Sequence, residues 1–216
     1  MSESKPLCIT AFASGRGSNL LSILKNIDDG SLNAKVVGVI SNSSKSGALQ
    51  TAEERSIPAL HISRLHYASD DEYEQHLLKV LSDLNTDLVI LAGYMKMMPE
   101  RIVRHYKNRM LNIHPALLPA FGGKGLYGRN VHQAVLDYGC KVSGVTVHLV
   151  DAEYDTGAPV MQRCVPVLDD DTAETLAARV LLEEHKIYAD AIRLFADERI
   201  KIEGRRIRIL PGSDKI

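Results

Sequence analysis

The sequence lacks an excess of charge of either sign and any long apolar run. Lysine and arginine number 26 and aspartate and glutamate number 27. This balance argues against bulk binding to nucleic acid or to a membrane surface. No apolar run approaches the roughly 18 residues that a membrane helix needs. Any anion that the protein binds must therefore be held by a local site.

Cysteine is also scarce, and its spacing is informative. The three cysteines, Cys8, Cys140 and Cys164, lie far apart and form no Cys-x-x-Cys pair. This argues against a disulfide framework and against a zinc site, so we expect buried small apolar side chains and no metal. The first residues lack the basic and apolar segments of a signal peptide. We therefore expect a cytoplasmic protein, where reducing conditions suit free thiols.

The first half of the chain alternates short apolar runs with helix-like stretches, as expected for one globular domain over residues 1–216. Strands are predicted at Leu7–Ala13, Val36–Ile40, Asp87–Gly93 and Met110–Ile113, and helices from about Asn19, over Ser46–Arg55, over Asp70–Leu84 and from Pro99 to about Tyr106. This alternation predicts the α/β class, with a doubly wound, mostly parallel sheet.

The second half of the sequence has a different order of strand-like and helix-like stretches, which predicts an antiparallel part. The expected elements are a glycine-rich loop over Pro119–Asn130, two strands over Val142–Val150 and Pro159–Val167, a long helix over Thr172–Phe195 and a small hairpin around Gly204. Asp171 and Glu174 have the spacing of a capping box at the start of the long helix.

The segment Ser14-Gly-Arg-Gly-Ser-Asn19 lies between a predicted strand and a predicted helix. Glycines let main-chain amides approach an anion closely, and a helix N-terminus attracts negative charge. The segment is too short for a Walker A motif and lacks the full dinucleotide spacing. It predicts a site for a single phosphate. The alternative is a plain tight turn with a helix cap.

Asn112 and His114 end a predicted strand, where two-residue spacing places both side chains on one face. Carboxyl ends of parallel strands are where open α/β sheets bind ligands. An amide can hydrogen-bond a developing oxyanion, and an imidazole can donate or shuttle a proton. The pair therefore fits acyl transfer. Two polar residues that satisfy a loop are the alternative.

A third polar cluster follows the strand that ends near Val150. It contains Asp151, Glu153 and Asp155, which could be turn formers. One of them could instead approach His114, favour the imidazolium and raise the pKa of His114. Spacing does not select among the three acids.

These motifs together resemble the folate-dependent glycinamide ribonucleotide formyltransferases, over nearly the whole chain. The resemblance is carried by Ser14–Asn19, Leu91-Ala-Gly-Tyr-Met95, Leu111-Asn-Ile-His-Pro-Ala-Leu-Leu-Pro119, Gly144-Val-Thr-Val-His148, Asp155-Thr-Gly-Ala-Pro159 and Glu184-His185. It implies a Rossmann-like formyltransferase fold and transfer of a formyl group from 10-formyltetrahydrofolate to the amine of glycinamide ribonucleotide in purine (IMP) biosynthesis. It further implies a phosphate-binding half over about residues 1–115 and a folate-binding half over about 116–216.

The resemblance also implies residue roles. Gly17, Ser18 and Asn19 hold the substrate phosphate, and Glu184 contacts the ribose or amine end. Asn112 and His114 stabilise the tetrahedral oxyanion, and Asp155 raises the pKa of His114 and assists proton transfer. The folate-binding residues are Met95, Lys96, Met97, Met98, Asn112, Asp151, Ala152, Glu153, Tyr154 and Asp155. Lys96 stands where many relatives carry arginine, so the planar fork of the guanidinium is lost. Ser69-Asp-Asp-Glu72 likewise stands where many relatives carry a basic residue.

The sequence also leaves other functions open. A related enzyme could formylate another amine, such as methionyl-tRNA or a sugar nucleotide, or could hydrolyse formyl-folate. A non-catalytic folate-binding module is a further class, which the presence of Asn112, His114 and Asp155 disfavours. We expect only small-molecule partners, with no nucleic acid and no membrane, and consider a homodimer possible.

Overall fold

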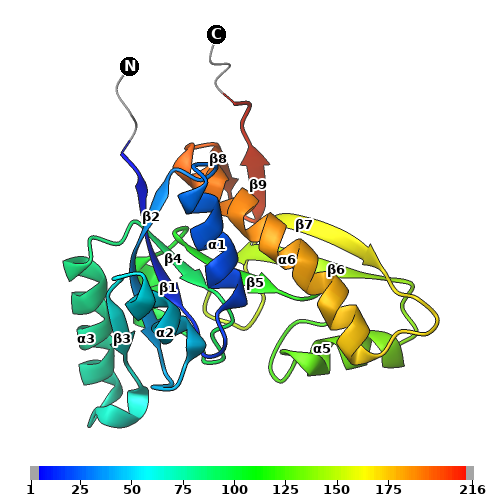
Figure 1. Ribbon diagram of the computed structural model, residues 1–216, viewed down its shortest axis with the longest axis horizontal. Helices are drawn as coiled ribbons and strands as arrows, with labels where there is room; N and C mark the ends of the chain where they lie inside the picture. Colours follow the sequence, from blue (N-terminus) through cyan, green and yellow to red (C-terminus); the bar gives the residue numbers. More distant parts are fainter. Residues whose placement is uncertain (1–4, 213–216) are drawn as a thin grey trace. The chain divides into compact units, whose positions relative to one another are not determined.

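Seven strands form one sheet in the order β3-β2-β1-β4-β5-β6-β7 in the computed structural model, which describes residues 5–212 (Figure 1). The strands are β1 (Leu7–Phe12), β2 (Ala34–Ser41), β3 (Ala59–His61), β4 (Leu88–Leu91), β5 (Met110–His114), β6 (Val142–Leu149) and β7 (Pro159–Pro166). A separate two-stranded sheet holds β8 (Ile200–Glu203) and β9 (Arg206–Ile209). The predicted α/β class is confirmed.

The helices are α1 (Ser18–Asp28), α2 (Gly47–Glu54), α3 (Asp70–Asp83), α4 (Glu100–His105), α5 (Arg129–Asp137) and α6 (Ala173–Ala196), with a short 3-10 turn, η1, at Arg64–His66. The chain divides into two compact units, Met1–Leu111 and Asn112–Ile216.

In the first unit, β1 pairs in parallel with both β2 and β4, and β2 pairs with β3. The strand order therefore reverses at β1, which is the switch point where open α/β sheets bind ligands beyond the strand ends. The loops that follow β1 and β4 are joined there. The Ser14 amide donates to the Gly93 carbonyl (3.0 Å), and the Met95 amide donates to Ser14 Oγ (2.8 Å).

The core of the first unit follows from strand composition. β1, β2 and β4 are nearly continuous apolar runs, as expected for strands covered on both faces. Their side chains are buried together with those of α1, α2 and α3, including Ile9, Phe12, Leu20, Ile23, Val39, Ile40, Leu77, Leu81 and Ile90. α1 and α2 contact each other and β2, and α3 contacts α4.

In the second unit, β6 and β7 pair in antiparallel fashion, and α6 packs on both strands and on α5. Valines of β6 alternate with small and polar residues, and all of Ser143–Leu149 is buried. α6 buries Leu176, Val180, Ile187, Tyr188, Ala191 and Ile192. This antiparallel pair and the β8–β9 hairpin confirm the predictions for the C-terminal half.

Two local predictions need correction, and one helix was missed. The capping box of α6 joins Thr172 to Thr175, while Asp171 accepts bonds from the Leu168 amide and Arg179. The cysteines are not buried, since Cys8 and Cys140 are half-buried and Cys164 is exposed on the edge strand β7. The helix α5 was not predicted, because its sequence begins inside the glycine-rich stretch.

No helix within residues 5–212 is both long and apolar enough to cross a membrane. The first residues, Met1–Ser4, on which the expectation about a signal peptide partly rests, lie outside the described part of the chain.

Candidate active site

The carboxyl end of β5 directs Asn112 and His114 to the same carboxylate. Apolar Leu111 and Ile113 alternate with them and are buried. His114 Nδ1 lies 3.5 Å from Asp155 Oδ2, and Asn112 Nδ2 lies 3.4 Å from Asp155 Oδ1. The shared face predicted from their two-residue spacing is therefore present.

Asp155 is the acid, of the three left open by spacing, that faces His114. It lies in the loop between β6 and β7 with φ of +57°, a left-handed conformation that Asp tolerates better than most residues. Its Oδ2 also accepts a hydrogen bond from the Gly123 amide at 2.9 Å. Asp151 and Glu153 are exposed, and Asp151 instead accepts the Thr156 hydroxyl within the same loop.

The loop can close because of a glycine. A Cβ atom on Gly157 would lie 1.7 Å from the Leu149 carbonyl oxygen, so no other residue fits without moving the main chain. The Leu149 amide donates to the Ala158 carbonyl (2.9 Å) across this point. The sequence Asp155-Thr-Gly157 thus ties the position of the carboxylate to the end of the β6–β7 ladder.

His148 is a member of this cluster that the sequence left undecided. Its Nε2 lies 3.0 Å from Asn112 Nδ2 and 3.5 Å from Asp155 Oδ1. Its Nδ1 lies 2.8 Å from the Leu149 carbonyl, an acceptor only, so Nδ1 carries the proton. His148 Nε2 therefore lies between the Asn112 amide and the Asp155 carboxylate. The available sequence signal was the position of His148 near the end of the predicted strand Val142–Val150, as His114 lies near the end of its own strand.

The two ring nitrogens of His114 both face acceptors. Nε2 lies 2.8 Å from the Phe121 carbonyl, opposite the nitrogen that faces Asp155. Burial lowers the pKa of His114 below 6.5, and Asp155 and the Phe121 carbonyl partly offset that shift. Asp155 thus raises the pKa of His114 as expected, but burial outweighs this effect, and the sequence could not show how deeply the imidazole is buried.

Asp155 is held ionised by its neighbours. Burial alone would raise its pKa, but the contacts with His148, His114 and the Gly123 amide outweigh burial and lower the pKa of Asp155 below 3.8. The side chains of His114 and Asp155 are 5% and 10% exposed. A buried anion beside a buried imidazole can favour a proton on that imidazole when charge develops nearby.

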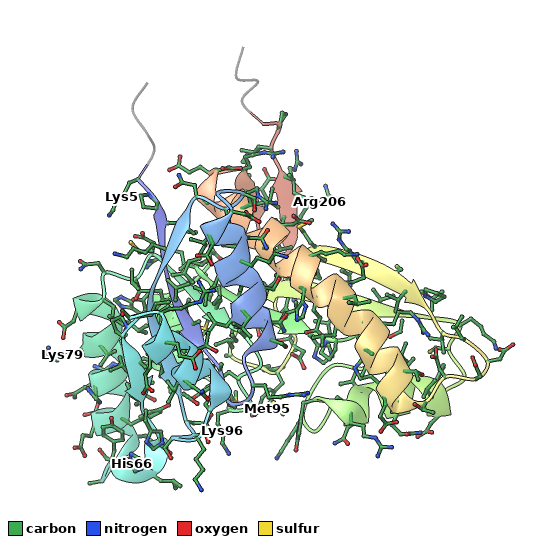
Figure 2. All side chains as sticks on the ribbon, viewed as in Figure 1. Lys5, His66, Lys79, Met95, Lys96 and Arg206 are labelled. Carbon is green, nitrogen blue, oxygen red and sulfur yellow. The ribbon has the colours of Figure 1, made fainter. Side chains whose placement is uncertain are left out.

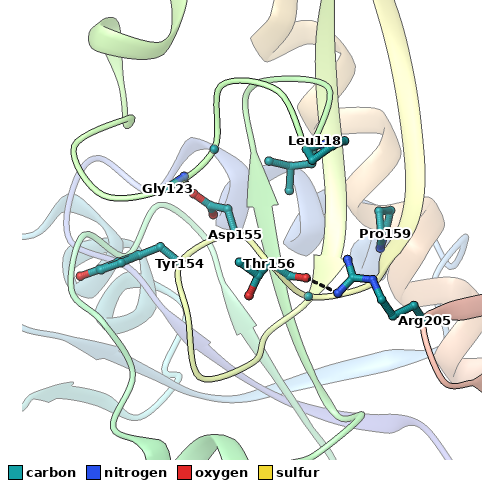
Figure 3. Close-up of a pocket in the computed structure, with 10 residues that line it drawn as sticks. Leu118, Gly123, Tyr154, Asp155, Thr156, Pro159 and Arg205 are labelled. Atoms are coloured by element: carbon teal, nitrogen blue, oxygen red, sulfur yellow. Dashed lines mark hydrogen bonds between the residues drawn. The ribbon is translucent and has the colours of Figure 1, made fainter.

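A cavity adjoins this cluster (Figure 3). Its volume is about 470 Å³, and it is lined by Leu118, Pro119, Gly122, Gly123, residues 154–157, Pro159 and Arg205. Asp155 thus has the buried imidazoles on one side and an open cavity on another. The β6–β7 loop and the segment after β5 supply most of the lining residues.

The predicted phosphate loop leads directly into the first turn of α1. Gly17 has φ of +80°, and a Cβ atom there would lie 2.9 Å from Ala48 Cβ. α1 begins at the next residue, and Gly17 has no side chain with which to cap it. The Gly15 carbonyl accepts from the Ala48 amide (3.3 Å) and from Ser46 Oγ (2.9 Å). These bonds hold the loop against the start of α2. The main-chain amides of the first turn of α1 follow Gly17 directly, and amides at a helix N-terminus can bind an anion.

The predicted folate-binding residues fall into two groups. Met95 and Met97 are 48% and 50% exposed, whereas Met98 is 5% exposed and belongs to the core. Exposed methionines next to the switch point suit contact with a flat ligand. Lys96 is exposed beside them (Figure 2). In the second unit, Ala152 and Tyr154 are exposed in the Asp155 loop, and Glu184 is half-buried in α6.

Within the part of the chain that the structure describes, no cluster of three or more His, Cys, Asp or Glu side chains could hold a metal ion.

Comparison with known proteins gives concordant results. The family model described as formyl transferase matches residues 8–192. A protein of Haemophilus influenzae named phosphoribosylglycinamide formyltransferase is 33% identical over 90% of this chain and 90% of its own length. The crystal structure of glycinamide ribonucleotide transformylase 1 from Symbiobacterium toebii is 41% identical, with a TM-score of 0.90 over 97% of this chain and 96% of that one.

A plant relative is longer. The protein of Arabidopsis thaliana named "Phosphoribosylglycinamide formyltransferase, chloroplastic" is 45% identical over 89% of this chain, and the match spans 66% of the relative's length.

Proposed function

The chain belongs to the formyl transferase family, and on that premise we propose that it transfers the formyl group of 10-formyltetrahydrofolate to the amine of 5'-phosphoribosylglycinamide. The products are phosphoribosyl-N-formylglycinamide and tetrahydrofolate, as a step of IMP biosynthesis. The observation that carries the proposal is the buried contact of His114 and Asn112 with one ionised carboxylate, Asp155. The names of the relatives point to the same amine acceptor and to transfer of a formyl group.

The substrate amine is the nucleophile, so the protein supplies position and charge stabilisation. Nitrogen attacks the formyl carbon, the carbonyl electron pair moves to oxygen, and a tetrahedral oxyanion forms. Collapse of this species breaks the bond to the folate nitrogen. That nitrogen takes up a proton, and the amine gives one up. No protein nucleophile is needed.

Asn112 and His114 are proposed to stabilise the oxyanion. The Phe121 carbonyl now occupies the acceptor position of His114 Nε2 at 2.8 Å, and it would have to move aside for an oxyanion to take up this hydrogen bond. An oxyanion in that place would be a far stronger acceptor than a carbonyl. Asn112 Nδ2 has two hydrogens, one directed to His148 at 3.0 Å and one in the longer contact to Asp155 at 3.4 Å, which would turn from Asp155 to the oxyanion. The second is the proposed donor to the oxyanion.

Asp155 is proposed to favour the imidazolium form of His114 and to relay protons through water. It is buried, ionised and next to the cavity of about 470 Å³. A water in such a cavity needs polar partners, and the Asp155 carboxylate is one. The net pKa of His114 in the free protein lies below its ordinary value, so negative charge from the oxyanion is what raises proton affinity during the reaction.

The other residues that the sequence pointed to are proposed as binding groups. Gly17, Ser18 and Asn19 would hold the phosphate at the start of α1, and Glu184 would contact the ribose or amine end. Exposed Met95, Lys96 and Met97, with Asp151, Ala152, Glu153 and Tyr154, would contact the folate. Met98 is buried and is proposed to shape this surface from beneath.

The test is formyl transfer by the purified protein from 10-formyltetrahydrofolate to phosphoribosylglycinamide, with appearance of the N-formyl product measured directly. The same donor with water or with methionyl-tRNA tests the hydrolase and the other-amine alternatives. Turnover with one of those acceptors and none with phosphoribosylglycinamide would remove the substrate assignment. His114→Ala should lower kcat far more than it changes substrate affinity.

We further propose that the protein works in the cytoplasm on small molecules alone. The Arabidopsis relative is named as chloroplastic, so cell fractionation is the deciding measurement. A homodimer stays a prediction, and sedimentation at several protein concentrations tests it.

A further inference from the structure

The β6–β7 loop that carries Asp155 receives a hydrogen bond from a distant part of the chain. Arg205 Nη1 donates to the Thr156 carbonyl at 2.8 Å, across 49 positions of sequence, and Figure 3 shows the bond at the edge of the cavity. Thr156 directly follows Asp155. We propose that Arg205 is a positioning residue, which holds the loop so that the Asp155 carboxylate stays against His114. This inference rests on the proposed role of Asp155.

The loop needs such a restraint. Asp155 adopts φ of +57°, which costs a non-glycine residue on the order of 1 kcal/mol unless neighbouring bonds hold it. Inside the loop, Asp151 Oδ1 accepts the Thr156 hydroxyl at 2.5 Å. That bond ties Thr156 to an exposed side chain of the same loop. The Arg205 bond ties it to a separate element.

Arg205 is well placed to hold the loop. Glu203 pairs with Arg206 in the β8–β9 ladder, so Gly204 and Arg205 form a two-residue hairpin turn. Gly204 has φ of +60° at the first turn position, which suits tight hairpins with glycine there. The Arg205 side chain therefore projects from the tip of a short, hydrogen-bonded hairpin.

The hairpin's acid does not compete for Arg205. Glu203 contacts Lys201 and Arg208, each at 2.9 Å. Arg205 is thus left to meet a neutral carbonyl, which is a weaker acceptor than a carboxylate. The result is a bond from an arginine to loop backbone one residue from the proposed catalytic acid.

The consequence concerns the His114 pKa. Asp155 raises it by proximity, against the lowering caused by burial. A loop free to move would spend time with Asp155 farther from His114, and the pKa of His114 would fall further. Small displacements of catalytic groups can lower rates strongly, so we expect a fall in kcat on the order of tenfold when the Arg205 bond is lost.

The experiment compares Arg205→Met with Arg206→Met, which removes the same charge from the neighbouring exposed position labelled in Figure 2. NMR titration of His114 in the free protein and the kcat and KM of formyl transfer are both measured. Arg205→Met should lower the His114 titration midpoint and kcat, with little change in KM for the amine. Arg206→Met should match wild type, and Arg205→Lys should recover part of both effects.

Equal titration midpoints in both methionine variants and wild type would overturn the proposal, whatever the activity. If wild type itself transfers no formyl group, the proposed function fails while the titration still decides the role of Arg205. A third readout needs no variant. Nitrogen NMR of the wild-type protein should show hindered rotation of the Arg205 guanidinium. A freely rotating guanidinium would contradict the bond.

Discussion

His114 Nδ1 lies 3.5 Å from Asp155 Oδ2, and the two side chains are 5% and 10% exposed. The histidine ends a strand, and the acid lies at a left-handed residue in the loop between two other strands. Because little water screens the pair, a change of charge on one side chain should alter the protonation of the other.

Asp155→Asn should lower the His114 pKa further below its ordinary value, because the carboxylate is the main influence that raises it. With less imidazolium available, kcat should fall on the order of a hundredfold, with a larger loss at higher pH. The kcat–pH profile and an NMR titration check this. Asp169→Asn is the control, since this exposed acid pairs with Lys141 at the surface. A His114 midpoint that stays at the wild-type pH would contradict the electrostatic role.

Stability should fall as pH is lowered through the ordinary histidine range. Burial lowers the pKa of both His114 and His132 below 6.5, so below that pH the unfolded chain binds more protons than the folded chain. Each histidine can change the unfolding free energy by up to about 1.4 kcal/mol per pH unit. Urea denaturation between pH 8 and pH 5 measures the slope. His132→Gln should reduce the slope of unfolding free energy against pH, with each variant compared with its own value at pH 8. An unchanged slope would show that His132 does not contribute to the pH dependence.

Gly17→Ala should destabilise the protein by about 1–3 kcal/mol and raise KM for the phosphorylated amine. The left-handed φ of +80° disfavours any side chain, and the added Cβ would crowd Ala48. Thermal denaturation and steady-state kinetics check the two effects. Gly15→Ala is the matched control for stability, because no heavy atom lies within 4 Å of its Cβ position. Equal melting temperatures for the two variants would show that Gly17 is not under strain.

Thr146→Val should cost about 2–3 kcal/mol of stability, because it leaves buried groups without partners. The Thr146 hydroxyl donates to the Ala116 carbonyl (2.7 Å) and accepts from the Leu118 amide (3.1 Å). Gln162 Nε2 also donates to it, at 2.9 Å. Thr146→Ser keeps the hydroxyl and should lose much less in urea denaturation. If serine costs as much as valine, the methyl group and not the network is responsible.

The elements of the fold follow from local patterns. A continuous apolar run such as Leu7–Phe12 predicts a strand that is buried on both faces. The amphipathic repeat of α3 predicts a helix, because burial of one helix face imposes a period on the sequence. Helix α5 was missed because its first turn lies in a glycine-rich stretch, where no period is visible. The N-cap of α6 was assigned to the wrong residue because Asp171 and Thr172 are both good capping residues. Only the structure shows that the Asp171 carboxylate pairs with Arg179, which leaves Thr172 as the cap.

The sequence by itself determined that Asn112 and His114 share a face, because side chains in a strand alternate with a period of two. It left Asp151, Glu153 and Asp155 open, since loops have no such period, and only the family resemblance singled out Asp155. Tertiary structure decided which carboxylate meets the imidazole, through the close approach of Gly157 to Leu149 and the Gly123 amide. It also decided the sign of the His114 pKa shift, because burial depends on residues distant in sequence that cover the ring.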